Sequence, residues 1–160
     1  MLDAPEVQRT YVGRLDGCLD FFLSDLIRKT FGWETASEAD LARLSARHPA
    51  YFPTDFIMPS FLDNHDMDRF LYICKGNKDA LRRAVDFQMH LPNPPMIYYG
   101  TEIGLNHQIG TREGGLDAGR GPMIWDEAQQ DRALFAYYAE KIQARKGAMR
   151  DQTISIPKNR

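Results

Sequence analysis

Charged and polar side chains crowd into one short stretch of the sequence, FLDNHDMDRF at positions 61–70. An apolar start leads directly into Asp63, Asn64, His65 and Asp66, and Arg69 follows them. Charged groups are costly to desolvate unless they are paired, so a dense set at a strand end is either a surface turn or a functional site. In the first interpretation Asp66 caps the next helix.

Three apolar runs around this stretch predict strands. Residues 15–22 are dominated by apolar side chains, as in a buried strand. The segment DFIMPSFLDNHD, residues 55–66, indicates a second strand that Pro59 interrupts, so Pro59 should lie at an edge or a bulge. Residues 96–99 form a third apolar run, which Gly100 ends.

Capping residues predict helices between and after these strands. Ser24 can cap a first helix, and Ser37 can cap a second helix that Pro49 closes. Asn77 is expected to cap a stronger helix, and residues 126–146 show the spacing of an amphipathic helix. This order of elements indicates parallel strands joined by crossover helices, which is the α/β class.

Chemistry in such folds lies just past the C-terminal ends of the strands. Both polar clusters fall there, because DNHD follows the second predicted strand and GTEIG follows the third. A long glycine-rich loop over residues 101–121 comes next, and loops of this length are usually functional or disordered. The tail contains TISI, residues 153–156, which we expect to form a short strand.

Length and composition fit one globular domain. The chain has 160 residues, of which 43% are hydrophobic and 26% charged, with a formal net charge of −2. The lack of a basic block argues against a nucleic-acid binder. Cys18 and Cys74 lie far apart and predict neither a zinc site nor a disulfide scaffold. No apolar run approaches the ~20 residues of a membrane helix, and the first ten residues do not resemble a signal peptide.

The motifs resemble those of a known family. FLDNHDMDRF resembles the Phe-x-x-x-His-Asp motif at the end of the seventh strand in the alpha-amylase family. PPMIYYGTEIGL resembles the eighth-strand segment of that family, and RGPMIWDE resembles the stretch that follows it. LDGCLDFFLSDLIRKTFG is similar to the sixth-strand segment and its helix. The four matches occur in the order of the family and cover most of residues 13–126.

This resemblance implies an activity on α-glucosidic bonds that retains the configuration of the sugar. Retaining chemistry needs two carboxyl groups, a nucleophile and an acid/base, and the family adds a third that stabilises the transition state. The resemblance implies that Asp66 is this third carboxylate and that His65 hydrogen-bonds sugar hydroxyls. An anion suits an oxocarbenium-like transition state, and an imidazole can hold ring hydroxyls.

The resemblance also implies roles for neighbouring residues. Asn64 and Arg69 are expected to bind substrate, and Arg69 is close enough in sequence to hold Asp66 ionised. A structural or supporting role is expected for Glu102, Tyr99 and Arg120. No cofactor is expected: calcium occurs in some relatives, but the sequence shows no cluster of ligands for it. The patterns around His48, His90 and His107 are those of surface histidines.

The length of the chain limits the resemblance. A complete barrel needs ~250 residues or more, whereas the matched segments correspond to strands six to eight. We therefore expect a partial (β/α)8 TIM barrel, an α/β fold, in residues 1–146, and a tail or the start of a following domain in residues 147–160. The nucleophile and the acid/base are expected upstream. The segment GRLDG, residues 13–17, fits the short Arg-x-Asp pattern of the nucleophile motif, but the sequence after it fits the sixth strand better.

Three strands taken from a closed barrel leave open edges that invite association. We expect self-association, or completion by a missing N-terminal barrel portion, and neither a nucleic-acid nor a membrane partner. An α-glucan or maltooligosaccharide is the expected substrate. A cytoplasmic location is expected from the cysteine usage. The alternative to an enzyme fragment is a non-catalytic carbohydrate-binding or assembly module derived from the same barrel.

Overall fold

The computed structural model describes residues 5–154, apart from the side chains at positions 116 and 151–154. The helices are α1 (Pro5–Arg9), α2 (Phe21–Ile27), α3 (Glu38–Arg47), α4 (Phe70–Ile73), α5 (Lys78–His90), α6 (Thr111–Gly114) and α7 (Arg132–Ile154). The strands are β1 (Ser60–Phe61) and β2 (Pro95–Met96). A π-helical turn continues α2, and short 3-10 turns occur at His48–Tyr51, Thr101–Ile103, Leu116–Arg120 and Glu127–Gln129.

Three chain segments run parallel at the centre of the fold. β1 and β2 pair in parallel, with Ser60 opposite Pro95. On the other side, Gly17 forms a parallel bridge with Ile57. A Cβ at position 17 would lie 2.0 Å from the carbonyl oxygen of Ile57, so only glycine permits this approach. The parallel order predicted from the alternation of elements is therefore confirmed among the described residues.

The apolar run over residues 15–22 does not form a strand throughout its length. Cys18 and Asp20 donate backbone N–H groups to the segment before β1, but α2 already begins at Phe21. The side chain of Asp20 accepts a hydrogen bond from Leu23 N–H at 3.0 Å and caps this helix. The prediction that Ser24 is the cap is wrong, because a carboxylate four positions earlier already satisfies a free N–H of the first turn.

Two further strand predictions differ from the structure in length. β1 begins directly after Pro59, so the proline stands at the strand start, where its missing N–H costs little. β2 ends at Met96, whereas a strand was expected over residues 96–99. Tyr98 and Tyr99 therefore lie beyond the regular strand, where the chain turns toward the site.

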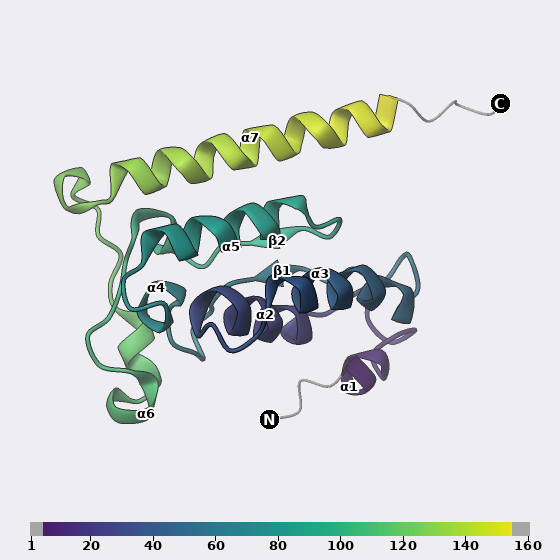
Figure 1. The fold of residues 1–160 in the computed structure, drawn as a ribbon, viewed down its shortest axis with the longest axis horizontal. Helices are drawn as coiled ribbons and strands as arrows, with labels where there is room; N and C mark the ends of the chain where they lie inside the picture. The colour runs from purple at the N-terminus through teal and green to yellow at the C-terminus, as the bar shows by residue number, and fades with distance from the viewer. Residues whose placement is uncertain (1–4, 155–160) are drawn as a thin grey trace.

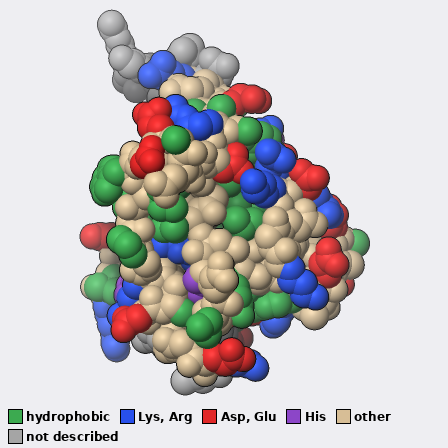
Figure 2. Space-filling model, turned by 90° about the vertical axis from the view of Figure 1, so that its left-hand side faces the viewer, with side chains coloured by type: hydrophobic (Ala, Val, Ile, Leu, Met, Phe, Trp, Pro, Cys, Tyr) green, Lys and Arg blue, Asp and Glu red, His purple; other side chains and the backbone are tan. Residues whose placement is uncertain are grey.

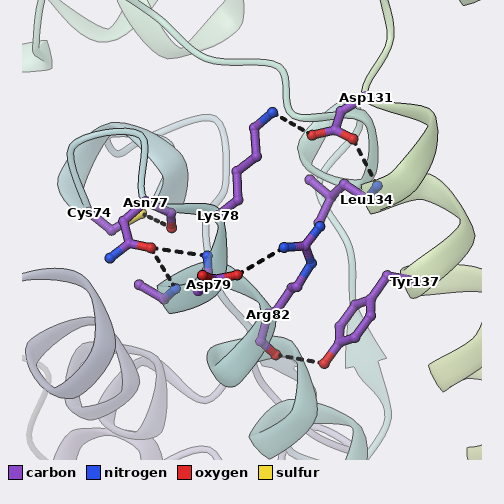
Figure 3. A network of polar contacts seen from close by, with 9 residues as sticks. Cys74, Asn77, Lys78, Asp79, Arg82, Asp131, Leu134 and Tyr137 are labelled. Carbon is purple, nitrogen blue, oxygen red and sulfur yellow. Dashed lines mark hydrogen bonds and ion pairs between the residues drawn. The ribbon is translucent and has the colours of Figure 1, made fainter.

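Helix α5 packs against α7 and forms the outer layer of the fold. Figure 1 shows the two helices side by side, with α2 and α3 on the other side of the strands. Asn77 caps α5 as predicted, since its Oδ1 accepts hydrogen bonds from Asp79 N–H and Ala80 N–H. Figure 3 shows how Lys78 at the start of α5 reaches Asp131 before α7, at a distance of 2.7 Å.

The core lies between these layers. Its largest fully buried apolar side chains come from α2, α3, β1, α4, α5 and α7: Ile27, Leu41, Phe61, Phe70, Leu81, Val85 and Leu134. Apolar residues of α5 recur at helical spacing on the buried face, which explains why this helix was the most strongly predicted one. None of the helices in residues 5–154 is long and apolar enough to cross a membrane.

The C-terminal helix differs from its predicted bounds. α7 spans Arg132–Ile154, whereas a helix over residues 126–146 was expected. Asp126 caps a short 3-10 turn instead, by accepting from Ala128 N–H at 3.0 Å. Thr153 and Ile154 belong to α7, so a strand at TISI is wrong for those two residues. Residues 147–154 of the expected tail thus lie in α7, and residues 155–160 lie outside the described part of the chain.

Candidate active site

The turn that follows β1, residues 63–69, is called the Asp66 turn below. The side chains of His65 and Asp66 are 64% and 59% exposed, and His65 Nε2 lies 3.4 Å from Asp66 Oδ2. Asn64 is buried, and its Oδ1 accepts a hydrogen bond from Asp66 N–H at 2.8 Å. The structure thus brings His65 and Asp66 together at the surface, while the Asn64 oxygen is used to shape the turn.

Arg120 approaches the Asp66 turn from the loop after β2. Its Nε donates to His65 O at 2.8 Å, and its Nη2 donates to Asp66 Oδ1 at 3.0 Å. The loop can come this close because Gly119 has no Cβ, which would lie 2.9 Å from Met67 O. The loop over residues 101–121 contains several short helical turns. Arg120, near its end, fixes the position of the exposed carboxylate.

Asp63 forms the buried base of the turn. Its Oδ2 accepts from Phe70 N–H at 2.8 Å, and Thr101 Oγ1 donates to the same carboxylate at 2.9 Å. Burial raises the pKa of Asp63, although these hydrogen bonds and the charges of Arg28 and Arg69 oppose the shift. Asp63, and not Asp66, serves the N-terminus of α4, so the interpretation of Asp66 as the helix cap is wrong.

Arg69 lies away from the exposed carboxylate. Its side chain is 1% exposed, its guanidinium lies over the rings of Tyr98 and Tyr99, and its Nη1 donates to Tyr99 O at 2.8 Å. The role predicted for Arg69, contact with substrate or with Asp66, receives no support from this placement. Arg120 occupies the position beside Asp66 instead, because the loop after β2 folds back over the turn.

Arg28 of the π-helical turn joins both ends of the Asp66 turn. It is buried, and its Nη1 donates to Leu62 O at 2.9 Å and to Asp68 O at 3.0 Å. The guanidinium also lies 5.0 Å from the ring centre of Trp33. Burial lowers the pKa of Arg28, and the charges of nearby aspartates oppose the shift. One side chain thereby fixes both the turn and the indole.

Two of the residues with an expected supporting role lie behind the turn. The hydroxyl of Tyr99 donates to Gly121 O at 2.7 Å, which connects the residue directly before the second polar cluster to the end of the loop. Glu102 is half-buried, and its Oε2 has no hydrogen-bond partner among the described residues. The charges of Asp63 and Glu102 add to burial in raising the pKa of Tyr138.

A cavity of about 750 Å³ opens beside the Asp66 turn. It is bordered by the turn, by one side of α2 and by α1, through side chains that include Gln8, Ser24, Arg28, Trp33, Asp66 and Asp68. Viewed from the side on which α6 lies, acidic, basic and hydrophobic side chains are interspersed, with no large area of one charge (Figure 2). A neutral ligand suits such a surface better than a polyanion.

Two histidines that were expected at the surface are buried. His48 Nε2 lies 2.9 Å from Asp20 Oδ2, and both side chains are almost fully enclosed. The imidazole of His107 lies 3.6 Å from Asp68 Oδ1 and packs edge-on against Tyr72. Burial lowers the pKa of His107, and the charge of Asp68 opposes this shift. His90 is exposed, as predicted.

Within residues 5–154, no group of three or more His, Cys, Asp or Glu side chains is arranged to hold a metal ion. The carboxylates beside the turn have protein partners instead. Asp68 Oδ1 accepts from Thr111 N–H at 2.7 Å, and Asp25 pairs with Lys29 at 2.6 Å.

Comparison with known proteins identifies the fold and the family. The family model for the alpha amylase catalytic domain matches residues 5–151. The chain belongs to the alpha-amylase family. Alpha-amylase 2 of Dictyoglomus thermophilum is 32% identical over 149 residues, and Neopullulanase 2 of Thermoactinomyces vulgaris is 46% identical over 87 residues. A solved cyclomaltodextrinase superposes on 91% of this chain with a TM-score of 0.79 and 26% identity. These relatives are glycoside hydrolases.

The chain spans only part of these relatives. The match to Alpha-amylase 2 covers 91% of this chain and 26% of that protein. The match to Neopullulanase 2 covers 54% of this chain and 14% of that protein, and the solved cyclomaltodextrinase is covered over 24% of its length. Family membership is therefore established for residues 5–151, a segment that runs past the boundary expected at residue 146.

Sequence reasoning missed the buried residues that hold the turn. Arg28 was not singled out because it lies on an amphipathic helix, where a cation is usually solvated. Its spacing from Ser24, one helical turn earlier, was the available signal that it lies on an inward face. Asp63 was interpreted only as part of a polar cluster, although it directly follows the buried Leu62.

Proposed function

We propose that this chain forms strands six to eight of a (β/α)8 barrel that cleaves or transfers α-glucosidic bonds with retention. Asp66 stabilises the positive charge of the transition state, and His65 hydrogen-bonds a sugar hydroxyl beside it. The nucleophile and the acid/base belong to parts of the relatives that this chain does not span. The observation that supports this proposal most is the exposed His65–Asp66 pair directly after a parallel strand.

The strand assignment rests on three parallel segments with their helices. The segment around Gly17, strand β1 and strand β2 lie in the order of sequence, as neighbouring strands do in a barrel of this class. The Asp66 turn and the turn at Gly100 both follow C-terminal strand ends, where barrel enzymes place their chemistry. This arrangement supports strands six, seven and eight for the three segments.

The proposed mechanism assigns a passive role to Asp66. Departure of the leaving group makes the glucosyl ring cation-like, and a carboxylate within the site lowers the energy of that state. Arg120 fixes Oδ1 of Asp66 and leaves Oδ2 on the side of His65. A prepositioned anion pays no reorganisation cost as the charge develops.

A carbohydrate-binding module without catalysis is the second candidate. The ion pair and the hydrogen bond made by two other carboxylates on the cavity wall favour this second function. Asp25 pairs with Lys29, and Asp68 accepts a backbone hydrogen bond, so neither is free to attack a sugar. The turn could then bind glucans without cleaving them. Self-association of the chain and a cytoplasmic location remain predictions under either function.

Binding of maltotriose to the 160-residue chain, followed by the shifts of backbone amide signals, tests both candidates. We expect saturable shifts at residues 64–67, and a weaker affinity in His65→Ala. Asp117→Asn serves as control, because this carboxylate is 95% exposed and its nearest cation, Arg120, lies 3.8 Å away. Shifts that are absent, or that are the same for cellotriose, would contradict an α-glucan site at the turn.

A further inference from the structure

A tryptophan with an exposed face borders the cavity beside the Asp66 turn. The indole of Trp33 is 45% exposed and borders the same 750 Å³ cavity as Asp66. A large aromatic side chain contributes more apolar area than almost any other, so it gains free energy when a ligand covers it. Cavities of about 300–1,000 Å³ with aromatic walls and a few polar groups are typical ligand sites.

Trp33 is fixed relative to the Asp66 turn. Its backbone N–H donates to Arg28 O at 2.9 Å, and the Arg28 guanidinium lies against its ring. The same guanidinium bridges Leu62 O and Asp68 O, the two ends of the turn. The contacts of one guanidinium therefore connect the indole with the turn that carries the exposed carboxylate.

We propose that Trp33 is a glucan-contacting residue, and that a bound chain runs from Asp66 along α2 to this indole. The inference rests on the proposed function of the Asp66 turn. A glucan combines apolar C–H faces, which suit the indole, with edge hydroxyls, which suit the polar side chains that border the cavity. It is neutral, which suits the interspersed charges of the face in Figure 2. Longer oligosaccharides bind more tightly than maltose because only they reach Trp33.

Indole fluorescence tests this directly, because the chain has two tryptophans. The Trp125→Phe variant leaves Trp33 as the sole indole. We expect maltopentaose to cause a saturable blue shift of its emission, and cellopentaose to cause none. Trp33→Leu should weaken the binding of maltopentaose at least threefold and leave the affinity for maltose unchanged.

A parallel titration separates this inference from the proposed function. Maltopentaose should also shift the amide signals of residues 64–67. If those signals shift but Trp33 emission and the Trp33→Leu affinity do not change, the extension toward Trp33 is wrong and the function of the turn stands. If neither probe responds, both the extension and the proposed function are wrong.

Discussion

Asp63 is a buried carboxyl group that determines how the exposed residues of the turn are presented. It receives hydrogen bonds from the first N–H of α4 and from Thr101, which follows β2. Among the described residues, the guanidinium of Arg120 is the one side-chain partner of Asp66 besides His65. At the scale of residues, the geometry of the candidate site thus depends on a group that does not touch the substrate.

Removing the Thr101 hydroxyl should weaken this arrangement. Thr101→Val deletes the donor to Asp63 and leaves a buried carboxylate under-satisfied, which costs about 1–3 kcal/mol of unfolding free energy. Chemical denaturation of the unchanged chain and of Thr101→Val measures the difference in unfolding free energy. Thr54→Val, at an exposed position, is the control. A loss no larger than that of the control would show that the hydrogen bond contributes nothing.

The titration of His107 predicts how stability depends on pH. Burial lowers its pKa in the folded state, so the unfolded chain binds a proton more readily below about pH 6.5. The contribution of His107 to stability is therefore complete above that pH and is lost as the pH falls. Urea denaturation between pH 5 and 8 covers the ordinary histidine pKa of about 6.5. Over this range we expect the unfolding free energy of His107→Gln to depend less steeply on pH than that of the unchanged chain. His90→Gln, at an exposed position, should leave the dependence unchanged.

At the scale of elements, two arginines hold loops by bridging carbonyl groups. Arg28 bridges Leu62 O and Asp68 O around the Asp66 turn. Arg145 of α7 donates to the carbonyl groups of residues 89 and 91–93, which lie before β2. The two make matched variants, because lysine keeps the charge of each but loses the planar fork.

Arg28→Lys should loosen the Asp66 turn. We expect amide hydrogen exchange at residues 64–67 to become at least about tenfold faster, which corresponds to about 1.4 kcal/mol of local opening free energy. Arg145→Lys should speed exchange around residues 91–93 and leave the turn unchanged. Equal effects of both variants at the turn would mean that Arg28 acts only on global stability.

The elements predicted best from sequence are those with a local cause. The periodicity and the Asn77 cap indicated α5 correctly, and Ser37 caps α3 as expected. The contacts of Arg120 and Arg28 with the Asp66 turn join residues at least 34 positions apart. No local pattern encodes such contacts, since they depend on how helices pack around the strands. The motifs thus predicted a site at the Asp66 turn, which stays a prediction, but they did not indicate which arginine reaches it.

At the scale of the whole molecule, the strands and the segments that flank them expose apolar side chains. Leu15 is 54% exposed, Ile57 48% and Met96 37%. Strand edges with apolar side chains favour pairing with further chains. We expect the isolated chain to elute from size-exclusion columns as more than a monomer, and Leu15→Lys with Ile57→Lys to shift it toward monomer. A monodisperse monomer with a cooperative thermal transition would contradict this.

We propose that Asp66 stabilises a glycosidase transition state in a barrel to which this chain contributes three strands. A chimera in which residues 5–151 replace the matching segment of a cyclomaltodextrinase tests this role through sugar release from maltopentaose. We predict activity in this chimera, and a fall in kcat of at least about a hundredfold in Asp66→Asn with little change in KM. An Asp66→Asn chimera that keeps the kcat of its parent, or a parent chimera that binds maltopentaose without cleaving it, would contradict the claim.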